Sequence, residues 1–149
     1  MGKVFKGKSG VIIQKIREID SLYHAAAIKA NVSKGELSIW LALLNAKEEY
    51  SQQDICDIFS LPRQTVNSLI ANLTKKGFVC LKHDPGSRNR KIICLTESGR
   101  AFGQDQVSWI FEAEQKAREE TDPQELQVCI FMLEKYIQRL QKEIEAREA

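Results

Sequence analysis

The chain lacks any long apolar segment. A transmembrane helix needs a run of about 18 apolar residues, and no such run occurs, so we expect no membrane span. The N-terminal stretch MGKVFKGKSGVIIQKI is basic and then apolar, but it has neither a long hydrophobic region nor a small-residue cleavage site. We therefore expect no signal peptide and a cytoplasmic location.

The chain also lacks paired cysteines and clustered histidines. Its four cysteines, none of them in a CxxC pair, each lie within an apolar pattern: Cys56, Cys80, Cys94 and Cys129. The pattern favours small buried hydrophobic residues, with a redox or metal role as the alternative. Unpaired cysteines without a signal peptide indicate a reducing compartment. His24 and His83 are too far apart to suggest a metal motif, so we predict neither a metal nor a cofactor.

Recognisable catalytic motifs are absent as well. We find no Ser-His-Asp set, no paired carboxylates at a spacing typical of acid–base catalysis and no glycine-rich phosphate loop. The acidic residues concentrate in the terminal helical segments, where solvation explains them. The sequence therefore predicts that this protein is not an enzyme.

Charge is unevenly distributed in this 149-residue chain, whose length fits one domain or one compact subunit. The overall net charge is only +2, but residues 62–91 contain seven basic residues and one acidic residue, a net charge of +6. Residues 112–149 contain six basic and ten acidic residues, a net charge of −4. A basic centre fits an anionic ligand, and the acidic end indicates a different role; two ordinary solvated faces are the alternative.

The segment 51–100 has a distinctive order of predicted elements. Ser51 and Asp54 form a capping-box pattern that opens a short helix, and Ser33 with Glu36 forms another one for the preceding helix. After a turn at 60–61, Pro62 suits the first position of a second short helix, 62–76, which Gly77 ends. Two short helices joined by a tight turn are typical of a helix-turn-helix.

The helix 62–76 is amphipathic. Its apolar stripe consists of Val66, Leu69, Ile70 and Leu73. The remaining surface carries short polar side chains, which can donate and accept hydrogen bonds within a DNA groove. These polar residues are Gln64, Thr65, Asn67 and Ser68, with Arg63 and Lys75 near the two ends of the helix.

Two strands follow, Phe78–Lys82 and Lys91–Leu95, both rich in β-forming residues. The connecting loop contains Asp-Pro-Gly, a turn signal, followed by Arg88 and Arg90. Arginines at a hairpin tip can grip phosphates or enter a minor groove. A solvated surface loop is the alternative for this hairpin, which spans residues 82–91 and also includes Lys91.

Amphipathic helices are predicted on both sides of this core, at 11–30, 97–119 and from 123 almost to the C-terminus. The apolar stripes of these helices must be buried against other protein surface, and a single chain has little surface left to bury them. We expect a homodimer through 11–30 and 97–147 as one helical region, with a monomeric bundle as the alternative. The fold class is mainly α with a small β-hairpin wing: a winged helix-turn-helix at 33–95, flanked by dimerisation helices.

Two motifs then show a resemblance. The run Leu-Thr-Glu-Ser-Gly at 95–99 and the run Leu-Thr-Lys-Lys-Gly-Phe-Val at 73–79, in this order of elements, resemble the multiple-antibiotic-resistance regulator (MarR) family over about residues 11–144. The resemblance implies a homodimeric bacterial or archaeal transcription factor. It also implies that helix 62–76 reads the major groove, that wing 82–91 meets the minor groove, and that a small ligand or an oxidant releases the DNA.

The chain departs from the family pattern in the wing. Ser87 stands where the family usually has Asp, and Asn89 stands where it has a second arginine, so either Arg88 or Arg90 enters the groove. Ser60 stands where the helix-helix turn commonly has Gly. No cysteine lies in the first helix, so the hydroperoxide-sensing chemistry of some members is not carried over. An aromatic ligand pocket is one interpretation of Tyr23, Trp40, Phe102 and Trp109, with His24 beside them, and ordinary core packing is the other.

We therefore predict a homodimeric, sequence-specific DNA-binding regulator of transcription that reads a pseudo-palindromic operator, acts as a ligand-responsive repressor and has its two reading helices roughly 34–36 Å apart. The alternative is a winged-helix module that binds protein instead of specific DNA. The predicted DNA-binding residues are Arg63, Gln64, Thr65, Asn67, Ser68, Lys75, Arg88, Arg90 and Lys91; the predicted ligand-binding residues are Tyr23, His24, Trp40 and Trp109.

Overall fold

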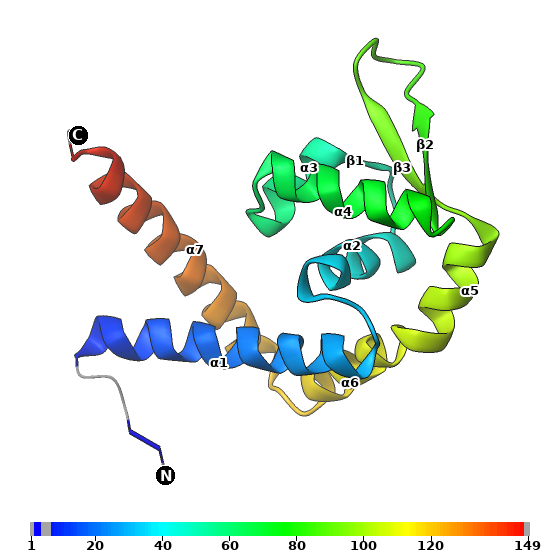
Figure 1. Cartoon of the computed structure of the whole chain (residues 1–149). Helices are drawn as coiled ribbons and strands as arrows, with labels where there is room; N and C mark the ends of the chain where they lie inside the picture. The colour runs from blue at the N-terminus through cyan, green and yellow to red at the C-terminus, as the bar shows by residue number, and fades with distance from the viewer. Residues whose placement is uncertain (1, 4–6, 148–149) are drawn as a thin grey trace. The chain divides into compact units, whose positions relative to one another are not determined.

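The computed structural model describes residues 2–3 and 7–147 and divides the chain into two compact units, Met1–Ile110 and Phe111–Ala149. The boundary falls inside α6, and each unit is described separately below (Figure 1). The helices and strands of the described residues are α1 (Lys8–Lys29), α2 (Lys34–Leu44), β1 (Tyr50–Ser51), α3 (Gln52–Phe59), α4 (Arg63–Lys75), β2 (Val79–His83), β3 (Lys91–Leu95), α5 (Glu97–Gln106), α6 (Trp109–Glu119) and α7 (Pro123–Glu145). None of the described helices is long and apolar enough to cross a membrane.

The predicted helix-turn-helix is present as α3 and α4. Its first helix opens with the predicted capping box: the Ser51 side chain accepts a hydrogen bond from the Asp54 N–H, and the Asp54 carboxylate accepts one from the Ser51 N–H. Ser60 in the turn has φ 51° and ψ 45°, the left-handed conformation that glycine adopts most easily. Ser60 therefore adopts a backbone conformation that is less favourable for it than for the glycine common at this position.

The second helix, α4, begins at Arg63, one residue later than predicted. Pro62 is its N-cap and has an extended ψ of 146°, so it precedes the helix and does not form its first turn. At the other end Gly77 has φ +79°, and the N–H of Phe78 donates to the Leu73 carbonyl at 3.0 Å. This closure needs a left-handed residue, which explains the glycine after the helix.

A three-stranded antiparallel sheet with the order β1-β3-β2 carries the wing. β3 has the predicted bounds, and β2 lies one residue further along than predicted. The two-residue β1 was not predicted, because a strand that short has no alternation to detect. It pairs Tyr50 with Ile93 and Ser51 with Ile92, so the start of α3 is fixed to the middle of the sheet.

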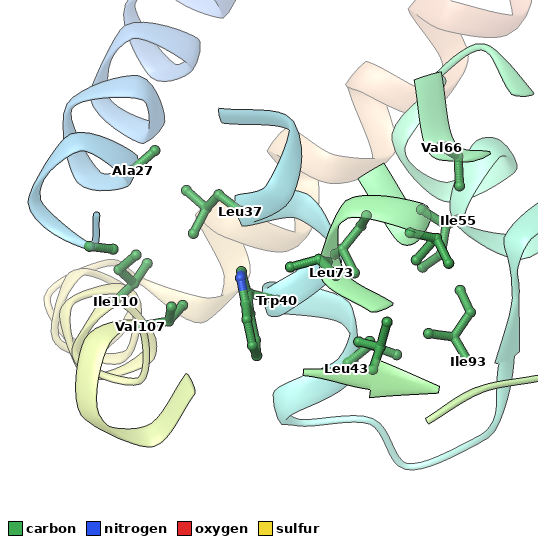
Figure 2. Packing of buried hydrophobic residues seen from close by; sticks show 14 of the residues in the cluster. Ala27, Leu37, Trp40, Leu43, Ile55, Val66, Leu73, Ile93, Val107 and Ile110 are labelled. Atoms are coloured by element: carbon green, nitrogen blue, oxygen red, sulfur yellow. The ribbon is translucent and has the colours of Figure 1, made fainter. Parts of the chain in front are cut away.

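The core of the first unit lies between α2, α4 and the sheet, with α1, α5 and the start of α6 contributing at one end (Figure 2). The predicted stripe of α4 is buried at Val66, Ile70 and Leu73, each no more than 1% exposed. Fully burying one such aliphatic side chain contributes roughly 1.5–3 kcal/mol. Trp40 packs against Phe78 and Phe102, with ring centroids 5.7 and 5.2 Å away.

Glu36 differs from its predicted capping role. Its backbone N–H does donate to the Ser33 hydroxyl at 3.1 Å, as expected. Its carboxylate, however, accepts hydrogen bonds from Asn72 at 3.0 Å and Lys76 at 3.3 Å. The side chain is nearly buried and faces α4, so it ties α2 to the end of α4 and does not complete a reciprocal capping box.

The prediction of one helix over 97–119 is wrong, because α5 and α6 are separate helices. The break falls at Val107 and Ser108, where the Ser108 N–H donates to the Gly103 carbonyl, five residues back. Val107 and Ile110 on either side of the break are both buried in the core of the first unit. The change of direction lets both side chains reach that core.

The flanking helices expose apolar side chains. α1 packs on α2 through Ala27 and Ala30, but Ile13, Ile16, Ile19 and Leu22 are each more than half exposed. In the second unit, α7 starts after Asp122, whose carboxylate accepts a hydrogen bond from the Gln124 N–H, and no residue of α7 is buried. Its exposed apolar stripe consists of Ile130, Leu133, Ile137, Leu140 and Ile144.

The cysteines are less buried than expected. Cys56 is buried in α3, in agreement with the sequence pattern. Cys80 and Cys129 are exposed and Cys94 is half-buried, so for these three the prediction of buried hydrophobic residues is wrong. Cys80 follows the buried Val79 in an extended strand and therefore points to the opposite, outer face of the sheet.

Gly99 offers a test of the packing of α5 on the sheet. A Cβ at this position would lie 1.9 Å from the Phe78 carbonyl oxygen. Because backbone cannot move aside as a flexible side chain can, we expect Gly99→Ala to lower the free energy of unfolding by about 1–3 kcal/mol. Denaturant titration measures this loss, and Ser98→Ala, at the exposed neighbouring position, is the matched control. Equal stability of the two variants would contradict the close approach.

Candidate nucleic-acid interface

The polar residues predicted to read bases lie together on the outer surface of α4. Gln64, Thr65, Asn67 and Ser68 are all exposed, and their side chains make no hydrogen bond within the described part of the chain. Asn72, one turn further on, is different because its amide is held by Glu36. The N-terminal half of α4 thus presents free donors and acceptors, while its C-terminal half is tied to α2.

Exposed basic residues lie on α4 and on the wing of the first unit. Arg63 and Lys75 are at the two ends of α4, and Arg88 and Lys91 are on the wing; all four are exposed and form no ion pair with any described residue. Lys76 and Lys82, by contrast, pair with Glu36 and with Glu49, the latter at 2.9 Å. The basic residues thus fall into two groups: four that are unpaired among the described residues, and two lysines whose ion pairs stabilise the fold.

Arg90 is the wing cation with internal partners. Its guanidinium donates to the Asp54 carboxylate at 2.7 Å and to the Asp84 carboxylate at 3.2 Å. Asp54 lies in the first turn of α3 and Asp84 lies just after β2, so Arg90 links the helix-turn-helix to the hairpin tip. The Asp84 N–H also donates to the Arg90 carbonyl at 3.0 Å, which closes the loop 84–90.

Both carboxylates that hold Arg90 are stabilised in the ionised form. The pKa of Asp54 is lowered first by the Ser51 backbone N–H and then by Arg90. The pKa of Asp84 is lowered first by the Gly86 N–H, at 2.9 Å, and then by Arg90. A depressed carboxyl pKa stabilises the folded state above the unfolded pKa of about 4 and loses that effect as the pH falls through the folded value. The linkage is therefore intact at neutral pH.

A cleft of about 400 Å³ joins the wing to the start of both helices. Its cationic lining residues are Arg63, Arg90 and Lys91, and Ser87 and Asn89 come from the wing tip. Gln52 and Gln53 also line it, and no sequence pattern had marked them as candidates. The hairpin extends away from the helices of this unit, so the cleft lies between two elements that both offer polar groups (Figure 1).

The residues predicted to bind a ligand do not share one environment. Trp40 is buried in the core, and its Nε1 has no hydrogen-bond partner among the residues that the structure describes. His24 is exposed, Tyr23 is half-buried against the core, and the Trp109 Nε1 donates to the Gln106 carbonyl at 2.9 Å. The ligand site stays a prediction. Among the described residues no group of three or more His, Cys, Asp or Glu is placed to hold a metal ion.

Known structures share this architecture at low sequence identity. A MarR family regulator from Neisseria meningitidis, NMB1585, has a TM-score of 0.80 and 18% identity, covering 92% of this chain and 96% of its own. A putative MarR family regulator from Listeria monocytogenes complexed with a 26mer DNA has a TM-score of 0.68 and 19% identity, covering 97% and 98%. BpsR of Bordetella bronchiseptica has a TM-score of 0.65 and 17% identity, covering 91% and 96%.

Sequence comparison adds no further relatives. No protein-family model matches the chain, and no curated protein matches it. The structural likeness, which extends over nearly the whole length of both partners, nevertheless shows the fold. The chain has the winged helix-turn-helix fold of the MarR family regulators.

The two wing arginines give contrasting expectations. Arg90→Ala removes both ion pairs that fix the loop, so we expect faster amide exchange across residues 84–90. Arg88→Ala removes a side chain without an internal partner and should leave this exchange unchanged. Hydrogen–deuterium exchange followed by mass spectrometry distinguishes the two. Equal exchange in both variants would mean that Arg90 does not brace the wing.

Proposed function

We propose that this protein is a cytoplasmic, sequence-specific DNA-binding regulator of transcription without catalytic activity of its own. The observation that carries the proposal is the outer face of α4, where four short polar side chains are exposed and without internal partners. Free donors and acceptors on the exposed face of a helix match the requirements of major-groove reading. The unpaired Arg63, Lys75, Arg88 and Lys91 would contact phosphates on either side of that groove.

The known structures support this reading. The Listeria protein is described as complexed with DNA, and the DNA binding of BpsR is described as regulated by 6-hydroxynicotinic acid. By analogy we propose that a small molecule controls DNA binding in this chain too, and that the protein is a repressor. Tyr23, His24, Trp40 and Trp109 remain the proposed ligand residues, although their environments differ.

The roles of the two wing arginines follow from their partners. Arg88 has none, so it is the arginine we propose for the minor groove. Arg90 would set the position of the wing through Asp54 and Asp84 and thereby act on DNA indirectly. Protein binding by the same face is the alternative function. The net charge of +6 over residues 62–91 favours a polyanion as the partner.

A selection of bound duplexes from a random pool tests the function. We expect enrichment of a pseudo-palindromic sequence and an affinity that falls steeply with salt, because every phosphate contact releases counterions. Arg88→Ala should weaken binding to all sequences, whereas Gln64→Ala or Asn67→Ala should change base preference, at about 1–3 kcal/mol for a good contact.

Asp57→Asn serves as the control, because Asp57 pairs with Gln53 within α3. No enrichment, with affinity insensitive to salt, would favour the protein-binding alternative. Unchanged base preference in both Gln64→Ala and Asn67→Ala would contradict the assignment of α4 as the reading helix.

We further propose that the protein is a homodimer. On α7 the residues Ile130, Leu133, Ile137, Leu140 and Ile144 alternate in steps of three and four, the spacing of a helix-packing seam. All of them are at least 42% exposed. Contiguous apolar surface of this kind marks an interaction site. A second copy would supply a matching stripe and would set two α4 helices against the two halves of a palindrome.

A charge placed in this stripe tests the dimer. Ile137→Glu puts a carboxylate in the proposed seam, so we expect a shift from dimer to monomer in sedimentation velocity. Gln138→Glu introduces the same charge at the next position and should remain dimeric. A monomeric parent protein, or an unchanged dimer in Ile137→Glu, would contradict the assigned seam.

A further inference from the structure

Two cysteines face each other across the wing. In the β2–β3 ladder Cys80 is the direct partner of Cys94. Side chains of direct partners lie on the same face of an antiparallel pair, here the outer face shared with Lys82. Burial is the largest cause of the raised pKa of Cys94, and the neighbouring Cys80 raises it further.

The separation of the two residues suits a disulfide. The Thr96 N–H donates to the carbonyl of its strand partner Phe78, and the Asp84 N–H donates to that of its partner Arg90. Hydrogen-bonded residue pairs alternate with non-hydrogen-bonded pairs along an antiparallel ladder. In this register Cys80 and Cys94 are therefore a hydrogen-bonded pair. Bonded antiparallel pairs have Cα atoms about 5.5 Å apart, within the roughly 4.4–6.8 Å that disulfides span.

Both cysteines are accessible to solvent, but they differ in how far they are exposed. Cys80 is exposed on the strand, and Lys82, whose ammonium pairs with Glu49, follows two residues later on the same face. Cys94 is half-buried and lines a cleft of about 220 Å³ together with Tyr50 and Arg100. An exposed thiol is reached first by an oxidant, and its half-buried strand neighbour is placed to resolve the product.

We propose that Cys80 and Cys94 are a redox pair that a peroxide converts into an intrachain disulfide, and that this modification weakens DNA binding. The Cys80 thiolate attacks a peroxide oxygen, the O–O bond breaks, and Cys80 becomes a sulfenic acid as one water forms. The Cys94 thiol then attacks the Cys80 sulfur, so the S–S bond forms and the S–O bond breaks. The departing hydroxide takes the proton of the Cys94 thiol and leaves as a second water. Two thiols are oxidised and one hydrogen peroxide is reduced.

The effect on DNA follows from where the disulfide forms and rests on the proposed function. The pair lies at the base of the hairpin whose tip carries Arg88 and whose loop Arg90 fixes to Asp54. A bond between the two strands changes their local twist, and the tip must then shift or lose its ion pairs. Because the thiols are accessible, a thiol reductant would reverse the change, as expected of a regulatory disulfide in a reducing compartment.

Peptide mapping tests the chemistry without reference to DNA. The full-length protein is reduced, treated with hydrogen peroxide, alkylated and digested with trypsin. We expect residues 77–82 linked to residues 92–100, at two mass units below the sum of the reduced peptides. Cys56→Ser/Cys129→Ser should retain the link, whereas Cys80→Ser and Cys94→Val should lose it. Links only to Cys129, or only sulfinic and sulfonic acids at Cys80, would overturn the pair.

DNA titration of the same samples tests the consequence. We expect oxidation to weaken binding on the order of fivefold or more, the lower end of typical coupling between two sites, and a thiol reductant to restore it. Cys80→Ser should bind like the reduced parent with or without peroxide. A mapped disulfide with unchanged affinity would overturn the regulatory step. A reduced protein that selects no DNA would instead refute the proposed function, while the mapped disulfide would stand.

Discussion

Burial of one stripe of α4 is the constraint on which the rest of the first unit depends. Val66, Ile70 and Leu73 are almost completely inaccessible, and together they fix the rotation of the helix about its axis. Because the rotation is fixed, Gln64, Asn67 and Ser68 lie on the solvent-exposed side of the helix. Glu36 fixes the far end of the same helix through Asn72 and Lys76, so α4 is held along its length while its outer face stays free.

Local rules explain most of what the sequence predicted. The capping box at Ser51 and Asp54, the glycine after α4 and the bounds of β3 each depend on residues close together in the chain. The features that were missed depend on distant contacts. β1 exists because Tyr50 finds Ile93, and the break between α5 and α6 lets both Val107 and Ile110 reach the core. Periodicity cannot detect either, since both sides of the break remain helical in pattern.

The candidate site also contains features that local sequence patterns predict and features that depend on distant contacts. That α4 would expose its polar residues could be predicted, because an apolar stripe implies an opposite face. The partners of Arg90 could not, since Asp54 is 36 residues away and already had a local role in capping. The same applies to Cys80 and Cys94, whose apolar surroundings suggested burial. Only the strand register, with Val79 turned inward, places both thiols on the outer face.

The wing therefore combines parts with different mechanical roles. β3 is held on one side by β1 and, at its upper end, by Arg90, so it is the fixed strand of the hairpin. β2 is an edge strand with exposed outer residues; outside the sheet it is held by the ion pair of Lys82 with Glu49. A covalent link from Cys94 to Cys80 would thus add a constraint between β3 and this edge strand. Because β2 leads directly into the loop 84–90, a change at the base of the hairpin is transmitted to the segment that carries Arg88.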